Sequence, residues 1–484
     1  MSASVAKNTM YMTMASVGQK VISFIYFTLI ARTIGAEGTG KYFLALSLST
    51  VFVIFVDLGL TNVLVREAAK MKENIQEYLS TVLSIKVILG GLTYVALVFT
   101  VGWMGYDEEI KHLVYLSGIT MLFDSLHLSL YGVLRAKGVL QYEAAGIVGS
   151  QLLTLVLGSA FLFAGLPIIY LILAFTIPSV LNALYAAGVL VFKYRISVLP
   201  LFHRTTFQHL FRIVIPFAIA AVFARLYSYA DTILLSKLMD ETAVGWYSIP
   251  YKITYAFQFI PLALIAAVYP RFSEFFGRGE KGELARIFQQ SVKYLLLVAF
   301  PIAAGIFVLA EDIIFFLYTE EYRASILPLK ILIMSLLFSY VSFPIGAFLN
   351  ACNRQITQTV IVGVVLVTNV ALNLLLIPKI GVAGAATAAF AGNLLLTIAG
   401  YAIVPDIARI SHRFMIKTVL QLGFAAFLMG TAVFGVRALH LFPGAAMNLF
   451  AAIATGVLAY PVALFLTRSF TKNELKEAWQ LVRR

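Results

Sequence analysis

Cysteine is almost absent from the sequence, since Cys352 is the only one among 484 residues. One thiol cannot form an internal disulfide, nor can it supply the sulfur ligands of a metal cluster. Charged side chains are scarce too, at 12% of the residues, whereas soluble domains have about 25%. Because 61% of the residues are apolar, we expect an all-α polytopic membrane protein with little room for a soluble domain.

Catalytic motifs are also missing. The glycines between Gly35 and Gly40 lie in a turn between two apolar runs and follow no strand, so they do not form a phosphate-binding loop. The sequence has no His-Glu-x-x-His, no paired cysteines and no nucleophile elbow. The segments between apolar runs are short, and a membrane glycosyltransferase or ligase would normally need a larger one for its catalytic acids. We therefore predict a protein that is not an enzyme and that needs neither a metal nor another cofactor.

The net charge of +13 raises the question of nucleic-acid binding, which the distribution of the charges answers. Lys and Arg lie at the ends of apolar runs and form no contiguous basic face. Basic segments alternate with acidic ones such as 107–109 and 240–241. This alternation is typical of membrane topology, and it predicts that both termini lie in the cytoplasm. No nucleic-acid partner is expected.

Fourteen apolar runs are long enough to span a membrane, which takes about 20 residues each. They lie near 10–34, 42–65, 77–103, 110–134, 142–165, 167–192, 207–238, 243–269, 287–310, 325–352, 356–378, 381–404, 415–437 and 446–467.

The first two of these helices return at a constant offset of 205 residues. The matching pairs are Lys20 and Arg225, Arg32 and Lys237, Gly40 and Gly245, Tyr42 and Tyr247, and Arg66 and Arg271. Matches in one register, with a mid-helix cation at both places, predict two pseudo-symmetric copies of one six-helix bundle. The predicted parts are an N-terminal lobe at 1–195, a C-terminal lobe at 207–405, two further helices at 415–468 and a cytoplasmic tail at 469–484.

Charged residues lie deep inside several of these helices. The cations are Lys20, Lys86, Arg225 and Lys252, and the acids are Asp57, Asp124 and Asp231. Each costs roughly 2.5 to 3.5 kcal/mol inside a membrane, so together they predict a hydrated or mutually paired interior. Polar residues share one helical face with Lys20, and Arg225 has the same setting on its helix. These two related helices predict a water-filled, electropositive cavity suited to an anionic ligand.

Structural roles remain open for the acids. Asp57 lies near the inner end of its helix, where we expect it to pair with Arg66 or to cap a turn. Asp124 and Asp231 could have a structural role, which is to neutralise Lys86 or Arg225. Alternatively, Asp57, Asp124 or Asp231 carries a coupling proton or sodium ion.

Several motifs resemble those of the Wzx-type polysaccharide flippases of the MATE/MOP superfamily, and the resemblance covers nearly the whole chain. The motifs are Asp57-Leu-Gly-Leu-Thr-Asn-Val-Leu-Val-Arg-Glu67 after the Gly-rich turn, Tyr269-Pro-Arg-Phe-Ser-Glu274, Phe348-Leu-Asn-Ala-Cys-Asn-Arg354, and Asn373-Leu-Leu-Leu-Ile-Pro-Lys-Ile-Gly-Val-Ala-Gly-Ala-Ala386.

The resemblance implies two six-helix lobes around a cavity that opens alternately to each side. It implies that the substrate is an undecaprenyl-diphosphate-linked oligosaccharide, moved to the outer leaflet among the other membrane lipids for O-antigen, capsule or exopolysaccharide assembly. Lys20, Arg225, Lys252 and Lys86 would receive the diphosphate, and a polysaccharide polymerase is a candidate partner. The alternatives are a lipid II flippase of the MurJ kind, a MATE-type drug or cation antiporter, whose cavity should be acidic, and a membrane glycosyltransferase or ligase.

Overall fold

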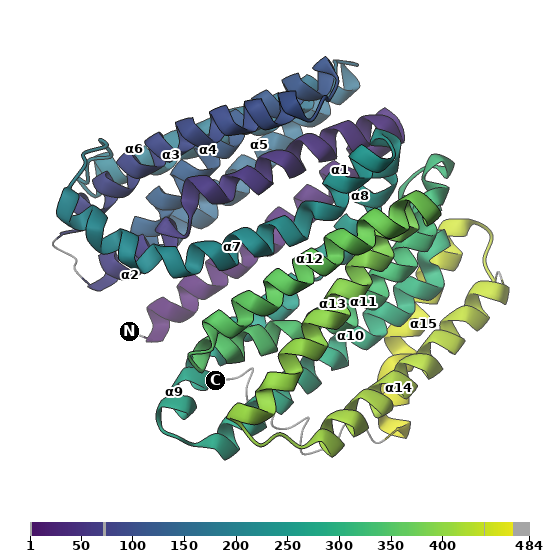
Figure 1. Cartoon of the computed structure of the whole chain (residues 1–484). Coiled ribbons are helices and arrows are strands. Elements are labelled where there is room, and N and C mark those ends of the chain that lie inside the picture. Colours follow the sequence, from purple (N-terminus) through teal and green to yellow (C-terminus); the bar gives the residue numbers. More distant parts are fainter. Residues whose placement is uncertain (1, 71–73, 440, 468–484) are drawn as a thin grey trace. The chain divides into compact units, whose positions relative to one another are not determined.

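The computed structural model describes residues 2–70, 74–439 and 441–467, and within these ranges it contains helices and no strand (Figure 1). Thirteen helical segments of the described chain are long and apolar enough to cross a membrane. The chain forms two compact units, Met1–Gly245 and Trp246–Arg484. The predicted lobes at 1–195 and 207–405 stay a prediction, and the predicted tail at 469–484 lies outside the described residues.

The first unit contains α1 (Ser2–Asp57), α2 (Leu60–Lys70), α3 (Ile75–Trp103), α4 (Glu108–Ala136), α5 (Gln141–Phe163), α6 (Ile169–Gly188), the short helix η2 (Val189–Lys193) and α7 (Arg204–Leu238). Helix α8 (Glu241–Ala256) crosses the boundary. The second unit continues with α9 (Phe259–Gly277), α10 (Lys281–Leu317), η3 (Glu320–Ser325), α11 (Ile326–Ala351), α12 (Gln355–Ile380), α13 (Val382–Ile407), α14 (His412–Leu439) and α15 (Ala445–Leu466).

Helix α1 reverses direction at Gly35. A straight helix of its 56 residues would be about 84 Å long, far more than a membrane needs. Gly35 has φ 69° and ψ −174°, a conformation that glycine adopts far more readily than other residues. The rings of Phe27 and Phe43 are 6.2 Å apart, although a straight helix would separate them by about 24 Å. The helix thus consists of two arms (Figure 1). If each arm is one membrane span, the thirteen segments correspond to the fourteen predicted helices.

The two turns that the predicted repeat relates contact each other within the first unit. A Cβ atom on Gly40 would lie 1.7 Å from the carbonyl oxygen of Glu241, and one on Gly245 would lie 1.9 Å from that of Ala36. The offset of 205 residues relates Ala36 to Glu241 and Gly40 to Gly245, so the contact is symmetric. Glycine is needed on both sides because any side chain would overlap the opposite backbone.

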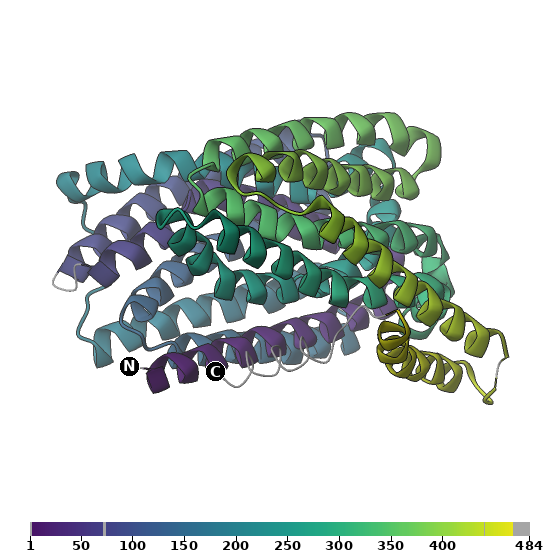
Figure 2. The same cartoon turned by 90° about the horizontal axis from the view of Figure 1, so that it is seen from below.

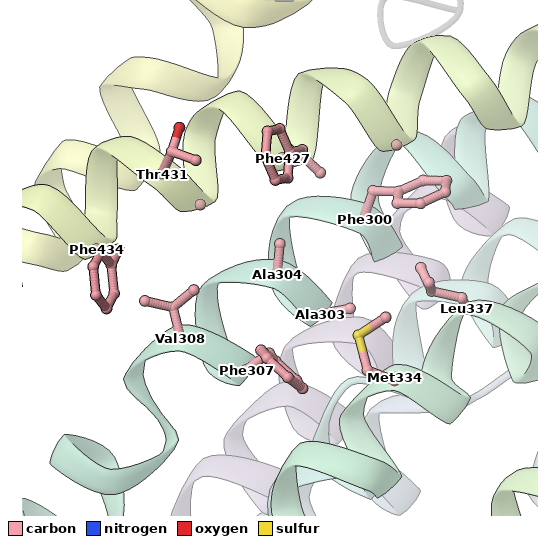
Figure 3. A pocket seen from close by; sticks show the side chains of 13 residues that line it. Phe300, Ala303, Ala304, Phe307, Val308, Met334, Leu337, Phe427, Thr431 and Phe434 are labelled. Atoms are coloured by element: carbon pink, nitrogen blue, oxygen red, sulfur yellow. The ribbon is translucent and has the colours of Figure 1, made fainter.

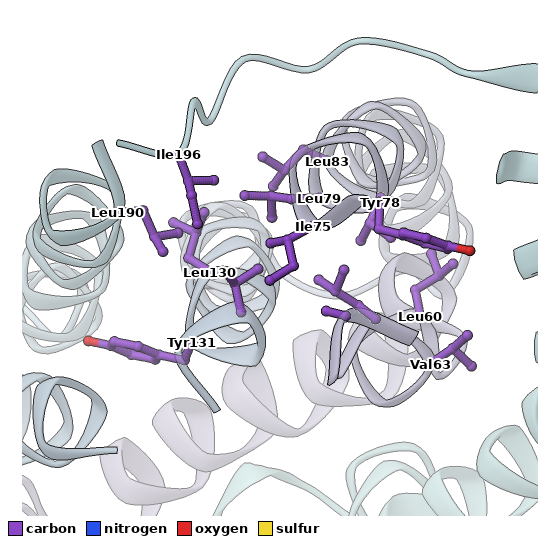
Figure 4. Close-up of a cluster of buried hydrophobic side chains, with 14 of the residues drawn as sticks. Leu60, Val63, Ile75, Tyr78, Leu79, Leu83, Leu130, Tyr131, Leu190 and Ile196 are labelled. Atoms are coloured by element: carbon purple, nitrogen blue, oxygen red, sulfur yellow. The ribbon is translucent and has the colours of Figure 1, made fainter. Parts of the chain in front are cut away.

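An apolar cluster fixes the short helix α2 in the first unit (Figure 4). Leu60 and Val63 of α2 belong to it, together with Leu79 of α3 and Leu130 of α4. Burying such side chains contributes about 1.5 to 3 kcal/mol each. The cluster thereby holds the start of α2 against α3 and α4, where the polar residues described below meet.

In the second unit, the single helix predicted near 243–269 is broken into α8 and α9. The Phe257 carbonyl would normally accept a hydrogen bond from residue 261, but Pro261 has no N–H. Instead it accepts one from the Ile260 N–H at 3.2 Å and one from the buried Tyr340 hydroxyl at 2.7 Å. A side chain of α11 thus compensates for the break, as backbone polar groups inside a membrane require.

Replacing Tyr340 by Phe is expected to lower the free energy of unfolding by about 1 kcal/mol, because the Phe257 carbonyl would keep only its bond to Ile260. Thermal unfolding of the purified protein measures this change. Tyr170→Phe is the control, since Tyr170 is exposed. Equal melting temperatures for the two variants would mean that the Tyr340 hydroxyl does not support the break.

Helices α14 and α15 pair with each other and pack on α10 at one side of the second unit (Figure 2). Met429 of α14, Leu449 and Ala452 of α15, and Leu309 of α10 share one buried cluster. The two C-terminal helices predicted at 415–468 are therefore held by α10.

Candidate functional site

Lys86 of α3 lies among oxygen atoms in the first unit. Its Nζ atom is 2.6 Å from Asp57 Oδ1. It also donates hydrogen bonds to Thr61 Oγ1 at 3.0 Å and to the carbonyl and hydroxyl oxygens of Ser125 at 2.7 and 3.0 Å. The Lys86 side chain is 0% exposed. A cation can be buried to this degree only when it is paired and hydrogen-bonded, and both conditions hold here.

Asp57 also terminates α1 and starts α2. Its Oδ2 accepts a hydrogen bond from the Gly59 N–H at 3.2 Å, and its Oδ1 accepts one from the Thr61 hydroxyl at 2.5 Å. The expectation that Asp57 caps a turn is thus met. Its expected ion-pair partner, Arg66, contacts Glu67 at 2.8 Å instead. Asp57 therefore combines a cap with the charge that neutralises Lys86.

Asp124 of α4 lies next to this group but does not pair with Lys86. Its Oδ1 accepts a hydrogen bond from the Ser179 hydroxyl of α6 at 2.5 Å and lies 3.7 Å from His127 Nδ1. The Asp124 side chain is 47% exposed. Nδ1 of His127 is buried and makes no hydrogen bond within the described part of the chain. Asp124 and His127 thus form a second polar group, which extends from α4 to α6.

The other predicted cations lie on α1, α7 and α8. Lys20 is on the first arm of α1 and Arg225 is on α7; both are partly buried, and these two helices pack against each other in the first unit. Asp231, which follows Arg225 by six residues on α7, is buried. Lys252 lies on α8 in the second unit, where it is partly buried.

Sequence reasoning missed two buried acids near the cytoplasmic side of the predicted topology. Glu143 is almost fully buried and accepts two hydrogen bonds from Arg135. Glu67 has 4% of its side chain exposed and lies near Arg66, Lys70 and His209. Both acids lie close to cations in the sequence, as the members of an exposed ion pair also do, so their spacing gives no sign of burial.

A separate cavity of about 440 Å³ lies between α10, α11 and α14 in the second unit. Figure 3 shows its lining of apolar side chains, among them Phe300, Phe307, Met334 and Phe427, with Thr431 as the one labelled hydroxyl. No charged residue lines it. It therefore offers no group that would bind a phosphate, and its chemistry suits hydrocarbon.

Comparisons with known proteins agree with this architecture. A family model described as polysaccharide biosynthesis protein matches residues 5–276, and one described as MatE matches residues 216–375. The chain is 24% identical over 494 residues to the probable low-salt glycan biosynthesis flippase Agl15 of Haloferax volcanii, with 99% of each chain covered. It is also 24% identical to a putative O-antigen transporter of Shigella flexneri, with 79% of this chain and 93% of the relative covered.

Among solved structures, a lipid II flippase MurJ in an inward closed conformation matches with a TM-score of 0.75 and 17% identity. The match covers 94% of this chain and 98% of that one, and it supports the all-helical polytopic fold. Since the polysaccharide biosynthesis model matches more than half of the sequence, the chain belongs to that family, which confirms its resemblance to the Wzx-type branch of the MATE/MOP superfamily.

Proposed function

We propose that the protein is a flippase that moves an undecaprenyl-diphosphate-linked oligosaccharide from the cytoplasmic to the outer leaflet by alternating access, without covalent catalysis. The observation that carries the proposal is the placement of deep cations on repeat-related helices, with Lys20 on α1 and Arg225 on α7. Arg binds a phosphate with a bidentate fork and Lys binds it as a point charge. The names of the glycan flippase and O-antigen transporter relatives support the same class of substrate.

In this proposal Lys20, Arg225 and Lys252 receive the diphosphate. Lys86 joins them only if its ion pair with Asp57 opens, because Asp57 neutralises it in this structure. Asp124 and Asp231 remain the candidates for a coupling proton or sodium ion.

The protein would lie in the inner membrane with both termini in the cytoplasm, and a polysaccharide polymerase would take over the exported glycan.

The direct test is translocation of undecaprenyl-diphosphate oligosaccharide by the purified full-length protein in lipid vesicles. Protein-dependent movement of this lipid, but not of lipid II, would support the proposal. Movement of lipid II alone would assign the protein to the MurJ-like alternative. Export of cationic dyes without any movement of the glycan lipid would favour the antiporter, although an electropositive cavity is poorly suited to a cation.

An inside-negative membrane potential is expected to accelerate export in these vesicles. A diphosphate carries about two negative charges, and outward movement of each is favoured by about 2.3 kcal/mol per 100 mV. A potassium gradient with valinomycin sets the potential, and a pH gradient is applied separately as the control. Dependence on the pH gradient alone would contradict this expectation and would point to proton coupling through Asp124 or Asp231.

A further inference from the structure

The oxygen atoms around Lys86 form a ligand set typical of a cation site. One carboxylate oxygen of Asp57, two hydroxyls of Thr61 and Ser125, and one backbone carbonyl of Ser125 lie 2.6 to 3.0 Å from Nζ. Hard cations bind to such oxygens in proteins. The site contains one carboxylate, so it balances a single positive charge.

Hydrogen bonds orient these oxygens toward Lys86. The Thr61 hydroxyl has one hydrogen, and Asp57 Oδ1 accepts it at 2.5 Å. The lone pairs of Thr61 are therefore directed to other donors, one of which is Lys86. Ser129 lies 3.2 Å from the same hydroxyl and donates to it, since Thr61 has no second hydrogen to give. The arrangement presents acceptors to a positive charge at its centre.

The oxygen ligands come from three helices, none of which is the helix that carries Lys86. Asp57 ends α1, Thr61 lies in the first turn of α2, and Ser125 and Ser129 are one turn apart on α4. The apolar cluster around Leu60 holds α2 in place. The Asp57 side chain is 23% exposed, while Thr61 and Ser125 are buried, so an ion would reach the site past Asp57.

We propose that Asp57, Thr61 and Ser125 form a monovalent-cation site in which the Lys86 ammonium serves as a permanently tethered ion. The ammonium takes the position that a free sodium or potassium ion would occupy, so the native protein binds no free ion there. A divalent ion fits less well, because the site has one acidic ligand and the described residues contain no cluster of three metal-binding side chains. Asp57 is consequently not a carrier of sodium while this pair is closed.

The test removes the tethered ion. Purified Lys86→Met keeps most of the length of the side chain but leaves the Asp57 carboxylate without its cation. We expect sodium or potassium chloride to raise the melting temperature of this variant by about 2 to 4 °C over N-methylglucamine chloride, by selective binding to the folded state. The melting temperature of the native protein should be the same in all three salts. Lys86→Ala, which leaves more room, should be stabilised by propylammonium as well.

The matched control is the double variant Asp57→Asn/Lys86→Met, which has no net charge at the site and should lose the ion response. The proposal is overturned if Lys86→Met and Lys86→Ala fold but melt at the same temperature in all cations. It is also overturned if the single variants fail to fold in every medium while the double variant folds. These readouts are thermal and do not depend on the proposed transport function.

Discussion

Alanine at Lys20 or at Arg225 is expected to reduce translocation of the glycan lipid by about ten- to a hundredfold. A charge-assisted hydrogen bond contributes about 1.5 to 3 kcal/mol, and each 1.4 kcal/mol corresponds to about a tenfold change. The initial rate in vesicles with equal amounts of reconstituted protein measures the effect. Because the two cations are repeat-related and proposed to bind one diphosphate, the double variant should lose less than the product of the two single effects.

Charge-preserving and distant substitutions separate binding from folding. Lys20→Arg should retain much of the rate, because the positive charge remains. Lys379→Ala removes an exposed cation at the end of α12 and should leave the rate unchanged. If Lys20→Ala and Arg225→Ala transport normally at full protein level, the headgroup does not bind to these residues and the assignment of the site is wrong.

Alanine at Gly40 or Gly245 is expected to destabilise the protein strongly, since each new Cβ would overlap a backbone carbonyl of the opposite turn. Overpacking costs about 1 to 3 kcal/mol even where side chains can adjust, and here the neighbouring atoms belong to the backbone. We expect low yield and a reduced melting temperature for both variants. Their effects should be similar in size, because the contact is symmetric.

Gly149→Ala provides the control, since a Cβ at this exposed position of α5 would meet no atom within 4 Å. The added methyl group should leave the melting temperature unchanged or raise it slightly, because alanine favours helix over glycine. Equal stability of Gly40→Ala, Gly245→Ala and Gly149→Ala would show that the two turns do not need close contact.

Helix number could be predicted from the sequence because it depends on local patterns. The lengths of the apolar runs predicted fourteen membrane helices. The offset of 205 residues related Gly40 to Gly245. The contact between these glycines could not be predicted, since an offset relates positions without bringing them together. The break after Ala256 was missed because Pro261 is a weak signal in a membrane helix and Tyr340, which compensates for it, is distant in sequence.

The partner of Lys86 could not be predicted for a similar reason. Asp57 and Lys86 are separated by the end of α1, all of α2 and the start of α3, and only the packing of α2 brings them within 2.6 Å. Helical spacing identified which residues share a face on one helix, but it does not choose between Asp57 and Asp124 as counter-ion. That choice depends on the tertiary arrangement.

The reversal at Gly35 has a consequence for biogenesis. If both termini lie in the cytoplasm, as the sequence predicts, a newly made chain with such a tight bend enters the bilayer as a helical pair whose bend passes through the hydrocarbon. Lys41 lies near the start of the second arm, six residues after Gly35, and its Nζ atom is 2.8 Å from carboxylate oxygens of both Glu37 and Glu109. Glu37 is already present when the pair inserts, whereas Glu109 is synthesised later. The nearby acid would lower the barrier to passage of Lys41, and the later one would anchor it after arrival.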